Sequence, residues 1–519
     1  MTKSSDTSRL WAMMDAHPMR VIAGLAVLVA ALWSVASALV HPNLPLDVIE
    51  GLAWGREMQW GYAKHPPMQA WLLELVAFVT ERADWGAFLL SYTAIAVALL
   101  AAGRLALDIV TPRLAVASVI LLLGVHYLGL TAVEFNPNVL LIPFWALAGW
   151  AFMRALRTPE QTRWWLILGL CVGTGFYVKY TIMLLAAVMG AFLVLDPAAR
   201  GVWRTRGPWW AGLAALLIAT PHLAWLVGNH GMPFAYAASR AEVTATGFIQ
   251  HISHPLQFAL AQFLALLPVA MLALVLLPWR RGTVSYEASA ADHAALDTMR
   301  RRALTILCWG PFLVLLVLSA VTGLRLRSMW GVSLWVFVGA WLMAATPWRW
   351  ICDDRAMRRL GVAASVLMVV WEVALICFYP LSPFLTGRGK RALFPGRDLA
   401  AQIDLEWSAR FPGLPLPYAV GDVWLAGNVG WYAAARPHVW IADQLVDPTA
   451  RFKNADSIKR GAVLIWSDAT DLAHWSPEAR SLLTVAQKMP DMLLEWQSAA
   501  PLSPILVHWA IVPAQVLTP

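Results

Sequence analysis

The sequence of 519 residues contains little charge. Asp, Glu, Lys and Arg make up 13% of it, while 59% of the residues are hydrophobic and the mean hydropathy is +0.60. Soluble domains usually carry about 25% charged residues, so this composition excludes a soluble globular protein and indicates a membrane protein. The apolar residues must be shared among many helices, because one bilayer span needs about 20 residues.

Cysteine is also scarce. The four cysteines lie in or near apolar runs and form no CxxC pattern (Cys171, Cys308, Cys352 and Cys377). This spacing excludes a disulfide framework and a cysteine-based zinc site. We therefore predict no certain cofactor; a divalent metal remains open, but no residue pattern supports one.

The apolar residues fall into about eleven runs that we expect to be transmembrane helices. These runs cover about 21–40, 84–103, 114–131, 139–153, 164–178, 181–195, 208–228, 256–278, 303–323, 329–346 and 360–379. Ala36-Ser37-Ala38 imitates a signal-peptidase site, but the preceding run is long for a signal peptide, so we expect it to stay uncleaved.

The positions of Lys and Arg predict the orientation, because these residues collect in cytoplasmic loops. With the N-terminus inside, the inner loops receive Lys3, Arg9, Arg20, Arg104, Arg113, Arg154, Arg157, Arg163, Arg200, Arg204, Arg206, Arg280, Arg281, Arg300, Arg301, Arg302, Arg349, Arg355, Arg358 and Arg359. The outer loops receive Arg56, Lys64, Arg82, Lys179, Arg240, Arg325 and Arg327. The formal charge of +8 therefore reflects topology and indicates no nucleic-acid partner.

An odd number of spans places the tail on the outer side. We expect a transmembrane module over residues 1–380, with a first outer loop at 41–83, and a separate outer domain over 381–519. Strand-like runs alternate with helix-like segments at 422–435 and 468–487 in this tail; the runs are PYAV, HVWI, AVLIW and ILVHWAIV. This alternation predicts a small α/β domain.

The first outer loop is unusually rich in charge. It includes LDVIEGLAWGREMQWGYAKHPPMQAWL, which begins at Leu46 and directly follows the first apolar run and its short connection. On a helix over 47–60, Asp47 and Glu50 share one face, and Arg56 points roughly the opposite way. The two carboxylates would then face one cleft, whereas the simpler alternative is a set of solvated loop charges.

Basic residues accompany these carboxylates. Lys64 and His65 precede a stiff Pro66-Pro67 pair, which leads into a helical run over 68–79. Such rigid placement of opposite charges suits chemistry on a phosphate ester, although the prolines alone can simply turn the chain. Lys179 lies between two apolar runs, where a snorkelling lysine would look the same.

Three motifs, taken in order, resemble the GT-C glycosyltransferases of the protein-mannosyltransferase and lipid A aminoarabinose-transferase superfamily. The first is the loop order of Asp, a short Trp-containing helix, Gly-Tyr, Lys-His-Pro-Pro and Ala-Trp-Leu. The second is GTGFYVKYT at 173–181, which resembles a Gly-rich helix that ends in Ser-Lys-Tyr-Thr. The third is Arg-Ser-Met-Trp at 327–330. The similarity covers most of residues 20–345.

This resemblance implies transfer of a sugar from a polyprenyl-phosphate carrier to a hydroxyl acceptor on the outer side of the bacterial inner membrane. Asp47 matches the family's loop Asp and would act as the base, with Glu50 nearby. The leaving phosphate needs cations more than a proton donor. Lys64, His65, Lys179, Arg325 and Arg327 are the candidates for this role, and Arg240 is a candidate on the acceptor side.

The sequence also departs from the family pattern. The second acidic position of the family is Asn138 here, and Glu134 is a candidate replacement for the missing carboxylate. Asn136 followed by Pro137 is typical of an ordinary helix start. The family's Glu before Lys-Pro-Pro, which can hold a metal, corresponds to Lys64, so we assign no metal ligand.

A transporter or flippase is the competing function class. Transporters usually carry ionisable residues at mid-membrane and show related halves, but here only His126 and Glu372 interrupt the span interiors, and no repeat is evident. A lipid-carrier polymerase or ligase would share the fold class. The sequence does not distinguish among sugars, or among glycolipid, lipid A, polysaccharide and protein acceptors.

Overall fold

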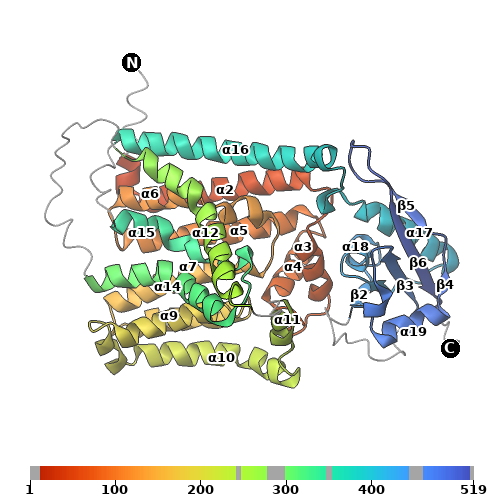
Figure 1. Cartoon of the computed structure of the whole chain (residues 1–519), viewed down its shortest axis with the longest axis horizontal. Coiled ribbons are helices and arrows are strands. Elements are labelled where there is room, and N and C mark those ends of the chain that lie inside the picture. Colours follow the sequence, from red (N-terminus) through yellow and green to blue (C-terminus); the bar gives the residue numbers. More distant parts are fainter. Residues whose placement is uncertain (1–11, 241–246, 278–297, 346–353, 444–459, 515–519) are drawn as a thin grey trace, which may run out of the picture.

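The computed structural model describes residues 12–240, 247–277, 298–345, 354–443 and 460–514, with the side chains of 239 and 240 excepted. Two parts lie end to end (Figure 1): a bundle of long helices and a C-terminal domain that contains the sheet. The first described residues, which lead into α2 (Pro18–Val40), lie at the opposite end of the bundle from this domain. Several residues discussed above lie outside the described ranges, namely Lys3, Arg9, Arg280, Arg281, Arg349 and Cys352.

Over its described residues, every predicted apolar run lies on one helix or on two or three consecutive helices. The bundle comprises α2 (Pro18–Val40), α5 (Trp85–Leu107), α6 (Pro112–Leu122), α7 (Pro137–Arg157), α8 (Thr162–Phe176), α9 (Ile182–Leu195), α10 (Gly207–Gly228), α12 (Gln250–Val275), α14 (Thr298–Thr322), α15 (Val338–Ala345) and α16 (Asp354–Thr386). Shorter helices α3 (Leu46–Gly55), α4 (Met68–Val79) and α11 (Met232–Arg240) lie at the end that faces the C-terminal domain (Figure 1).

Within the described residues, eight helical segments are long and apolar enough to cross a bilayer, or nine if one bent pair counts as a span. The runs at 164–178 and 181–195 form α8 and α9, which have only 15 and 14 residues. A helix of that length reaches about 22 Å, which is less than the roughly 30 Å of a hydrocarbon core. Helices therefore lie where the sequence predicted them, but fewer than the expected eleven are long enough to span a bilayer within the described residues, because α8 and α9 are short.

The run expected at 114–131 is not one straight helix. α6 breaks after Leu122 and continues as 3₁₀ helices η1 (His126–Leu128) and η2 (Leu130–Val133) at an angle of 84°. At the break, a Cβ on Gly124 would lie 2.7 Å from the backbone nitrogen of Val269. Only glycine permits this close approach of α12, and the bend directs the chain toward Glu134.

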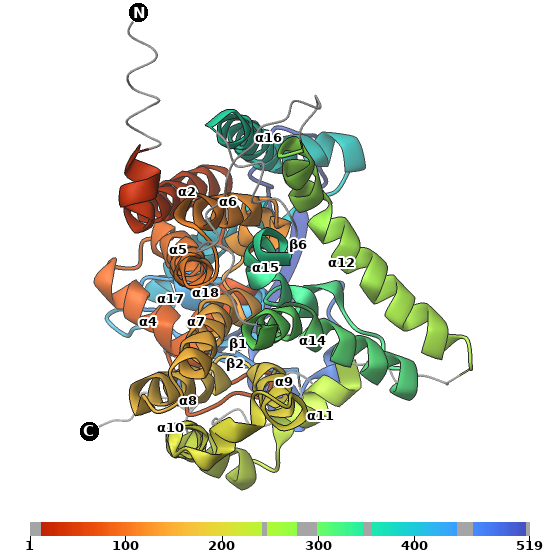
Figure 2. The same ribbon diagram turned by 90° about the vertical axis from the view of Figure 1, so that its left-hand side faces the viewer.

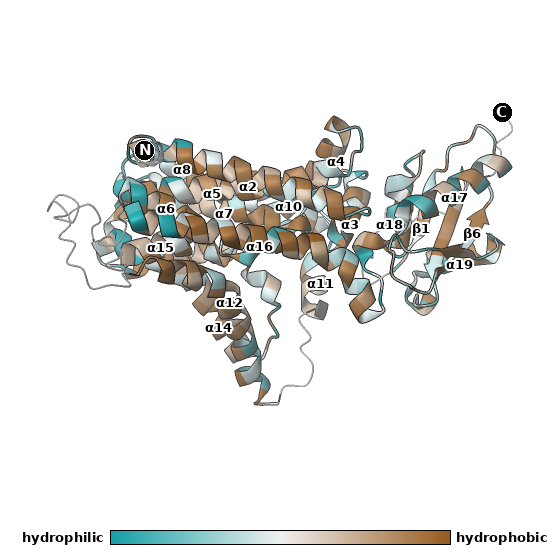
Figure 3. Cartoon of the chain, turned by 90° about the horizontal axis from the view of Figure 1, so that it is seen from above, coloured by the Kyte–Doolittle hydropathy of each residue, from teal (hydrophilic) through white to brown (hydrophobic). Residues whose placement is uncertain are grey.

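Hydrophobic side chains cover the outside of the bundle as well as its interior. Figure 3 shows apolar residues along the lengths of the helices and hydrophilic residues at the bundle end farthest from the C-terminal domain. Viewed from that end (Figure 2), α5 and α7 are interior and α12 slants outward. Exposed Leu217, Leu260 and Val369 illustrate the lipid-facing surface, as expected where the bilayer replaces water.

The C-terminal domain contains a mixed sheet in the order β2-β1-β3-β6-β4, with β5 also paired to β6. β1, β2 and β3 are parallel, and β6 is antiparallel to β3. The strands are β1 (Tyr418–Gly421), β2 (His438–Ile441), β3 (Ala462–Ser467), β4 (Gln487–Lys488), β5 (Met492–Leu494) and β6 (Ile505–Val512). The four predicted strands are β1, β2, β3 and β6, so the α/β prediction is confirmed.

Alternate strand residues bury the two faces of this sheet in different clusters. Ala419, Val463 and Ile511 belong to the cluster with α17 (Gly396–Arg410) and α18 (Leu425–Tyr432). Val420 and Leu464 belong to the cluster with α19 (Pro477–Val485). Because side chains alternate along a strand, the sheet is covered on both sides. The first cluster also contains Ala53 and Trp54 of α3, so this face packs against the first loop.

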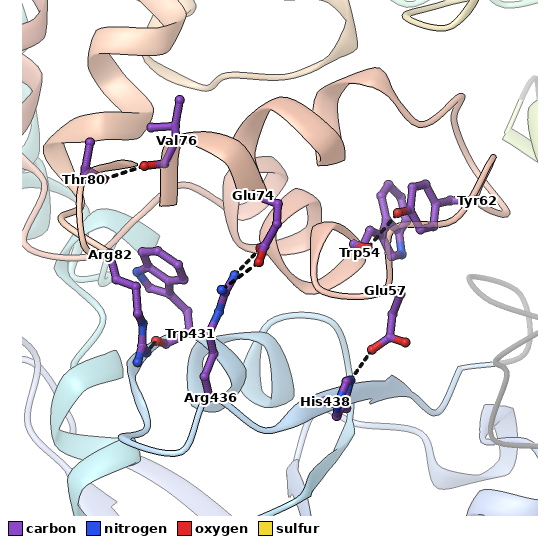
Figure 4. A network of polar contacts seen from close by, with 10 residues as sticks. All are labelled: Trp54, Glu57, Tyr62, Glu74, Val76, Thr80, Arg82, Trp431, Arg436 and His438. Carbon is purple, nitrogen blue, oxygen red and sulfur yellow. Dashed lines mark hydrogen bonds and ion pairs between the residues drawn. The ribbon is translucent and has the colours of Figure 1, made fainter. Parts of the chain in front are cut away.

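Polar contacts reinforce this packing between the first loop and the C-terminal domain (Figure 4). Arg436 forms an ion pair with Glu74 of α4, and His438 Nδ1 lies 2.6 Å from Glu57 Oε1. Arg82 donates to backbone carbonyls of α18 and the residue after it, Trp431 and Ala433. Apolar burial and charge pairing therefore fix the domain against α3 and α4.

Candidate functional site

Asp47 lies in the first turn of α3, and segments far away in the sequence surround it. Its Oδ2 accepts a hydrogen bond from Asn136 Nδ2 at 3.0 Å, and its backbone N–H donates to Glu134 Oε1 at 3.3 Å. Gln69 Nε2 donates to the carbonyls of Asp47 and Phe135, at 2.9 Å in each case. These contacts join the first loop to the start of α7 and hold the carboxylate in one place.

The side chain of Asn136 makes two kinds of contact, one with its own helix and one with Asp47. It is the N-cap of α7, and its Oδ1 accepts from the backbone N–H groups of Asn138 and Val139 at 2.9 and 3.2 Å. The predicted helix start is therefore confirmed. The same side chain uses its amide group to orient Asp47, a second contact that the capping pattern did not predict.

Lys179 reaches this cluster from the connection between α8 and α9. Its Nζ donates to Asn138 Oδ1. Burial lowers the pKa of Lys179 to about 8, although the nearby Asp47 charge acts in the opposite direction. Lys179 therefore does not behave as a lysine that snorkels to the membrane surface, since its ammonium group contacts a protein side chain. This group stays largely protonated at neutral pH.

Lys64 pairs with Glu50, the second carboxylate of α3. Lys64 Nζ lies 2.5 Å from Glu50 Oε1, with side-chain exposures of 12% and 7%. Burial acts to lower the pKa of Lys64, but Glu50, Tyr236 and Asp47 together raise it. Lys64 is therefore a fixed cation, and Glu50 serves chiefly as its partner.

His65 follows Lys64 but carries no charge at neutral pH. Burial, with help from Lys179 and Lys64, lowers the pKa of His65 to about 3. Its backbone carbonyl accepts from Tyr62 N–H at 3.1 Å. As a neutral ring, His65 can offer one donor and one acceptor, but it adds no positive charge to the site.

The two neighbouring carboxyl groups, Asp47 and Glu134, both bind protons more tightly than usual. Burial is the main cause of the raised pKa of Asp47, and the charges of Lys64, Arg391 and Lys179 oppose it. Burial and the Asp47 charge raise the pKa of Glu134 to about 7. The pair titrates as a unit, and an up-shifted carboxylate is a better proton acceptor at neutral pH.

A cavity of about 500 Å³ opens beside this cluster. Glu134, Asn136 and Asn138 form part of its wall, and helices α12 and η4 (Ser328–Gly331) form the other side. The remaining lining is mixed: His126, Tyr127, Thr131, Val139, Ala261, Leu264, Ala265, Ser328, Met329 and Val332. A space of this size with polar groups at one wall is typical of a ligand site.

The other predicted cations are not among the residues that line the cavity. Arg325 and Arg327 are exposed, and Arg327 directly precedes η4, which lines the cavity opposite Glu134. Arg240 ends α11, but its side chain lies outside the described residues. Within the described ranges, no three His, Cys, Asp or Glu side chains gather as a metal site.

Comparisons with known proteins agree with this arrangement. Residues 64–225 match the family described as dolichyl-phosphate-mannose-protein mannosyltransferase. The chain is 27% identical over 425 residues to the lipopolysaccharide core galacturonosyltransferase RgtA of Rhizobium johnstonii (strain DSM 114642 / LMG 32736 / 3841). This match covers 78% of the chain and 79% of RgtA. It is also 27% identical over 226 residues to the lipid A galacturonosyltransferase RgtD of the same strain. This second match covers 43% of the chain and 46% of RgtD.

The fold has a solved counterpart. ArnT from Cupriavidus metallidurans, in a crystal structure with bound undecaprenyl phosphate, superposes with a TM-score of 0.65 over 95% of this chain and 98% of ArnT, at 16% identity. The chain is a GT-C membrane glycosyltransferase. The resemblance inferred from the loop motifs is thereby confirmed.

Some residues of the candidate site were not predicted from the sequence. Gln69 bridges two backbone carbonyls from inside α4, and a polar residue in so apolar a helix is the one signal that pointed to it. Arg391, whose charge acts on Asp47 and Glu134, comes from the connection to the C-terminal domain. No local pattern marks that residue, because only the tertiary fold brings it near the first loop.

Proposed function

We propose that this glycosyltransferase moves a sugar from a polyprenyl-phosphate carrier to a hydroxyl group of a lipid A or polysaccharide acceptor. The observation that carries the proposal is the Asp47 carboxylate, held by Asn136 at 3.0 Å beside a cavity and near two partly buried lysines, Lys64 and Lys179. The named activities of RgtA and RgtD support a lipid A or core acceptor. The lipid named with the ArnT structure supports a polyprenyl carrier.

The proposed reaction uses Asp47 as the base. The acceptor oxygen forms a bond to the anomeric carbon as the bond between that carbon and the phosphate oxygen breaks, and Asp47 takes the hydroxyl proton. The carrier phosphate leaves as an anion, which Lys179 and Lys64 stabilise by charge. Glu134 completes the acidic wall and keeps the proton affinity of the pair high.

The proposed side of the membrane follows from the charge distribution. The site lies at the bundle end that faces the C-terminal domain, where the predicted outer loops gather, whereas the Lys- and Arg-rich loops belong to the other end. We therefore assign the site and the C-terminal domain to the periplasmic side of a bacterial inner membrane, with a cytoplasmic N-terminus. A hexuronosyl donor is the first to test, since both named relatives transfer galacturonic acid.

A reconstituted assay tests this function directly. The full chain in liposomes, given labelled undecaprenyl-phosphate-linked sugar and lipid A, should form labelled lipid A, and Asp47→Asn should abolish transfer at normal protein level. Label that accumulates inside the vesicles without transfer, at the same rate in Asp47→Asn, would favour a transporter and overturn the proposal.

A further inference from the structure

The segment between α16 and α17 is fixed against the loop that leads into α3. Asn43 N–H donates to the carbonyl of Ala392 at 3.1 Å, and Gln497 N–H donates to Leu393 at 2.9 Å. Both acceptors belong to the short 3₁₀ helix η7 (Arg391–Leu393). Since Asn43 lies four residues before Asp47, this contact places Arg391 beside the entrance to the catalytic loop.

Arg391 presents its guanidinium group on a rigid aromatic base. The group lies 5.7 Å from the Trp424 ring centroid, and Trp424 in turn packs edge-on against Phe394 at 5.3 Å. The residue is exposed. Stacking of this kind restricts a long side chain while leaving its hydrogen-bond donors available.

The other interface arginines are already engaged. Arg397 pairs with Asp84 at 2.6 Å, Arg436 pairs with Glu74, and Arg82 donates to backbone carbonyls. By contrast, Arg391 forms no ion pair within 4.0 Å with any carboxylate of the described residues. Its charge still lowers the pKa values of Asp47, Glu134 and Asp422 against the larger effect of burial.

An alternative role for Arg391 is purely structural. Asp422 is partly buried, and its Oδ1 accepts from the Trp424 and Leu425 N–H groups at the start of α18, at 2.8 Å in each case. Arg391 would then only balance the Asp422 charge. An exposed guanidinium is screened by water and contributes little to stability in this way, whereas the same position suits an anion that approaches from outside.

We propose that Arg391 is a specificity residue, which binds an oxyanion of the substrate, either the carboxylate of a uronosyl donor or a phosphate of the acceptor lipid. The proposal rests on the function proposed above. A guanidinium group suits both anions because it donates two parallel hydrogen bonds to carboxylate or phosphate oxygens. The C-terminal domain and its linker would thereby take part in substrate choice.

The test measures kcat/KM for four substrate combinations, with wild type, Arg391→Gln and Arg391→Lys. The donors are undecaprenyl phosphate linked to galacturonic acid or to galactose, and the acceptors are lipid A with and without its phosphates. Arg388→Gln is the matched control, because Arg388 is an exposed arginine three residues earlier. Thermal unfolding in detergent checks that each variant is folded.

Binding of the donor carboxylate predicts that Arg391→Gln lowers kcat/KM about 10-fold to 100-fold with the galacturonosyl donor, but less than about threefold with the galactosyl donor. Binding of the acceptor phosphate predicts the same loss with both donors, which disappears once the phosphates are removed. Arg391→Lys should retain an intermediate rate in either case. An equal loss of kcat/KM in all four combinations, or no loss in any of them, would overturn the role of Arg391. A wild-type protein that transfers no sugar in any combination would instead refute the proposed function.

Discussion

Asn136 holds Asp47 from the start of a different helix: its side-chain amide donates to Asp47 Oδ2 at 3.0 Å while its side-chain oxygen caps α7. The position of the proposed base is thus tied to the first turn of an interior helix. Because a capped helix end is rigid, the carboxylate is held in place before substrate arrives, as preorganised catalysis requires.

Replacing Asp47 with Asn should lower the transfer rate by about 100-fold or more. The amide matches the shape of the carboxylate but cannot accept the hydroxyl proton. Transfer of labelled sugar in liposomes is the measurement. Asp398→Asn, an exposed carboxylate of α17, is the control and should leave the rate unchanged; a fully active Asp47→Asn would remove Asp47 from the mechanism.

Lys179 should set the alkaline limit of activity. Its pKa is lowered to about 8, so the ammonium charge is present below that pH and is lost above it. A kcat/KM profile should therefore fall above pH 8. In Lys179→Arg, the charge persists because arginine does not deprotonate in this range, so the decline should move to higher pH. Coincident profiles for the two proteins would contradict the role of Lys179 as the leaving-group cation.

Filling the cavity should raise KM. Ala265 is buried on α12 and lines the cavity, so Ala265→Phe should increase the donor or acceptor KM by about tenfold or more. Ala270→Phe adds the same ring to an exposed position on the same helix. That control should keep the wild-type KM; equal effects in the two variants would show that the cavity is not the substrate site.

The Lys64 and Glu50 pair should stabilise the fold only as a unit. Lys64→Met or Glu50→Gln alone breaks this ion pair in a largely buried place, and each should lower the free energy of unfolding by about 3 kcal/mol. The double variant should lose less than the sum of these two losses. Denaturant unfolding in detergent micelles measures all three; strict additivity would mean that the two side chains do not interact.

The ion pair between Arg436 and Glu74 should keep the C-terminal domain docked. Arg436→Ala removes contacts that hold the domain on α4, and opening should become about tenfold more frequent. Hydrogen exchange of α18 and limited trypsin digestion detect this opening. The control is Arg410→Ala, which breaks an exposed pair within α17. If α18 exchanges at the same rate in the two variants, the ion pair does not hold the domain in place.

The sequence predicted most of the helices and four of the strands because hydrophobic period and length are local properties. It placed Asp47 and Glu50 on one helix for the same reason. The contact between Lys179 and Asn138, 41 residues apart, depends on how α7 and α8 pack, which no spacing rule specifies. His126 looked like a stray polar residue within a span, yet it lines the cavity because the chain bends after Leu122.

The length of α16 has a mechanical consequence. Its 33 residues extend for roughly 50 Å, which exceeds the roughly 30 Å of hydrocarbon that a span must cross. About 20 Å of this helix therefore stands in the headgroup layers or in water. Arg391 follows five residues after the last residue of this helix, so we expect the first loop and the sheet domain to meet near the level of the lipid headgroups, where a membrane-anchored acceptor can present its hydroxyl group without leaving the bilayer.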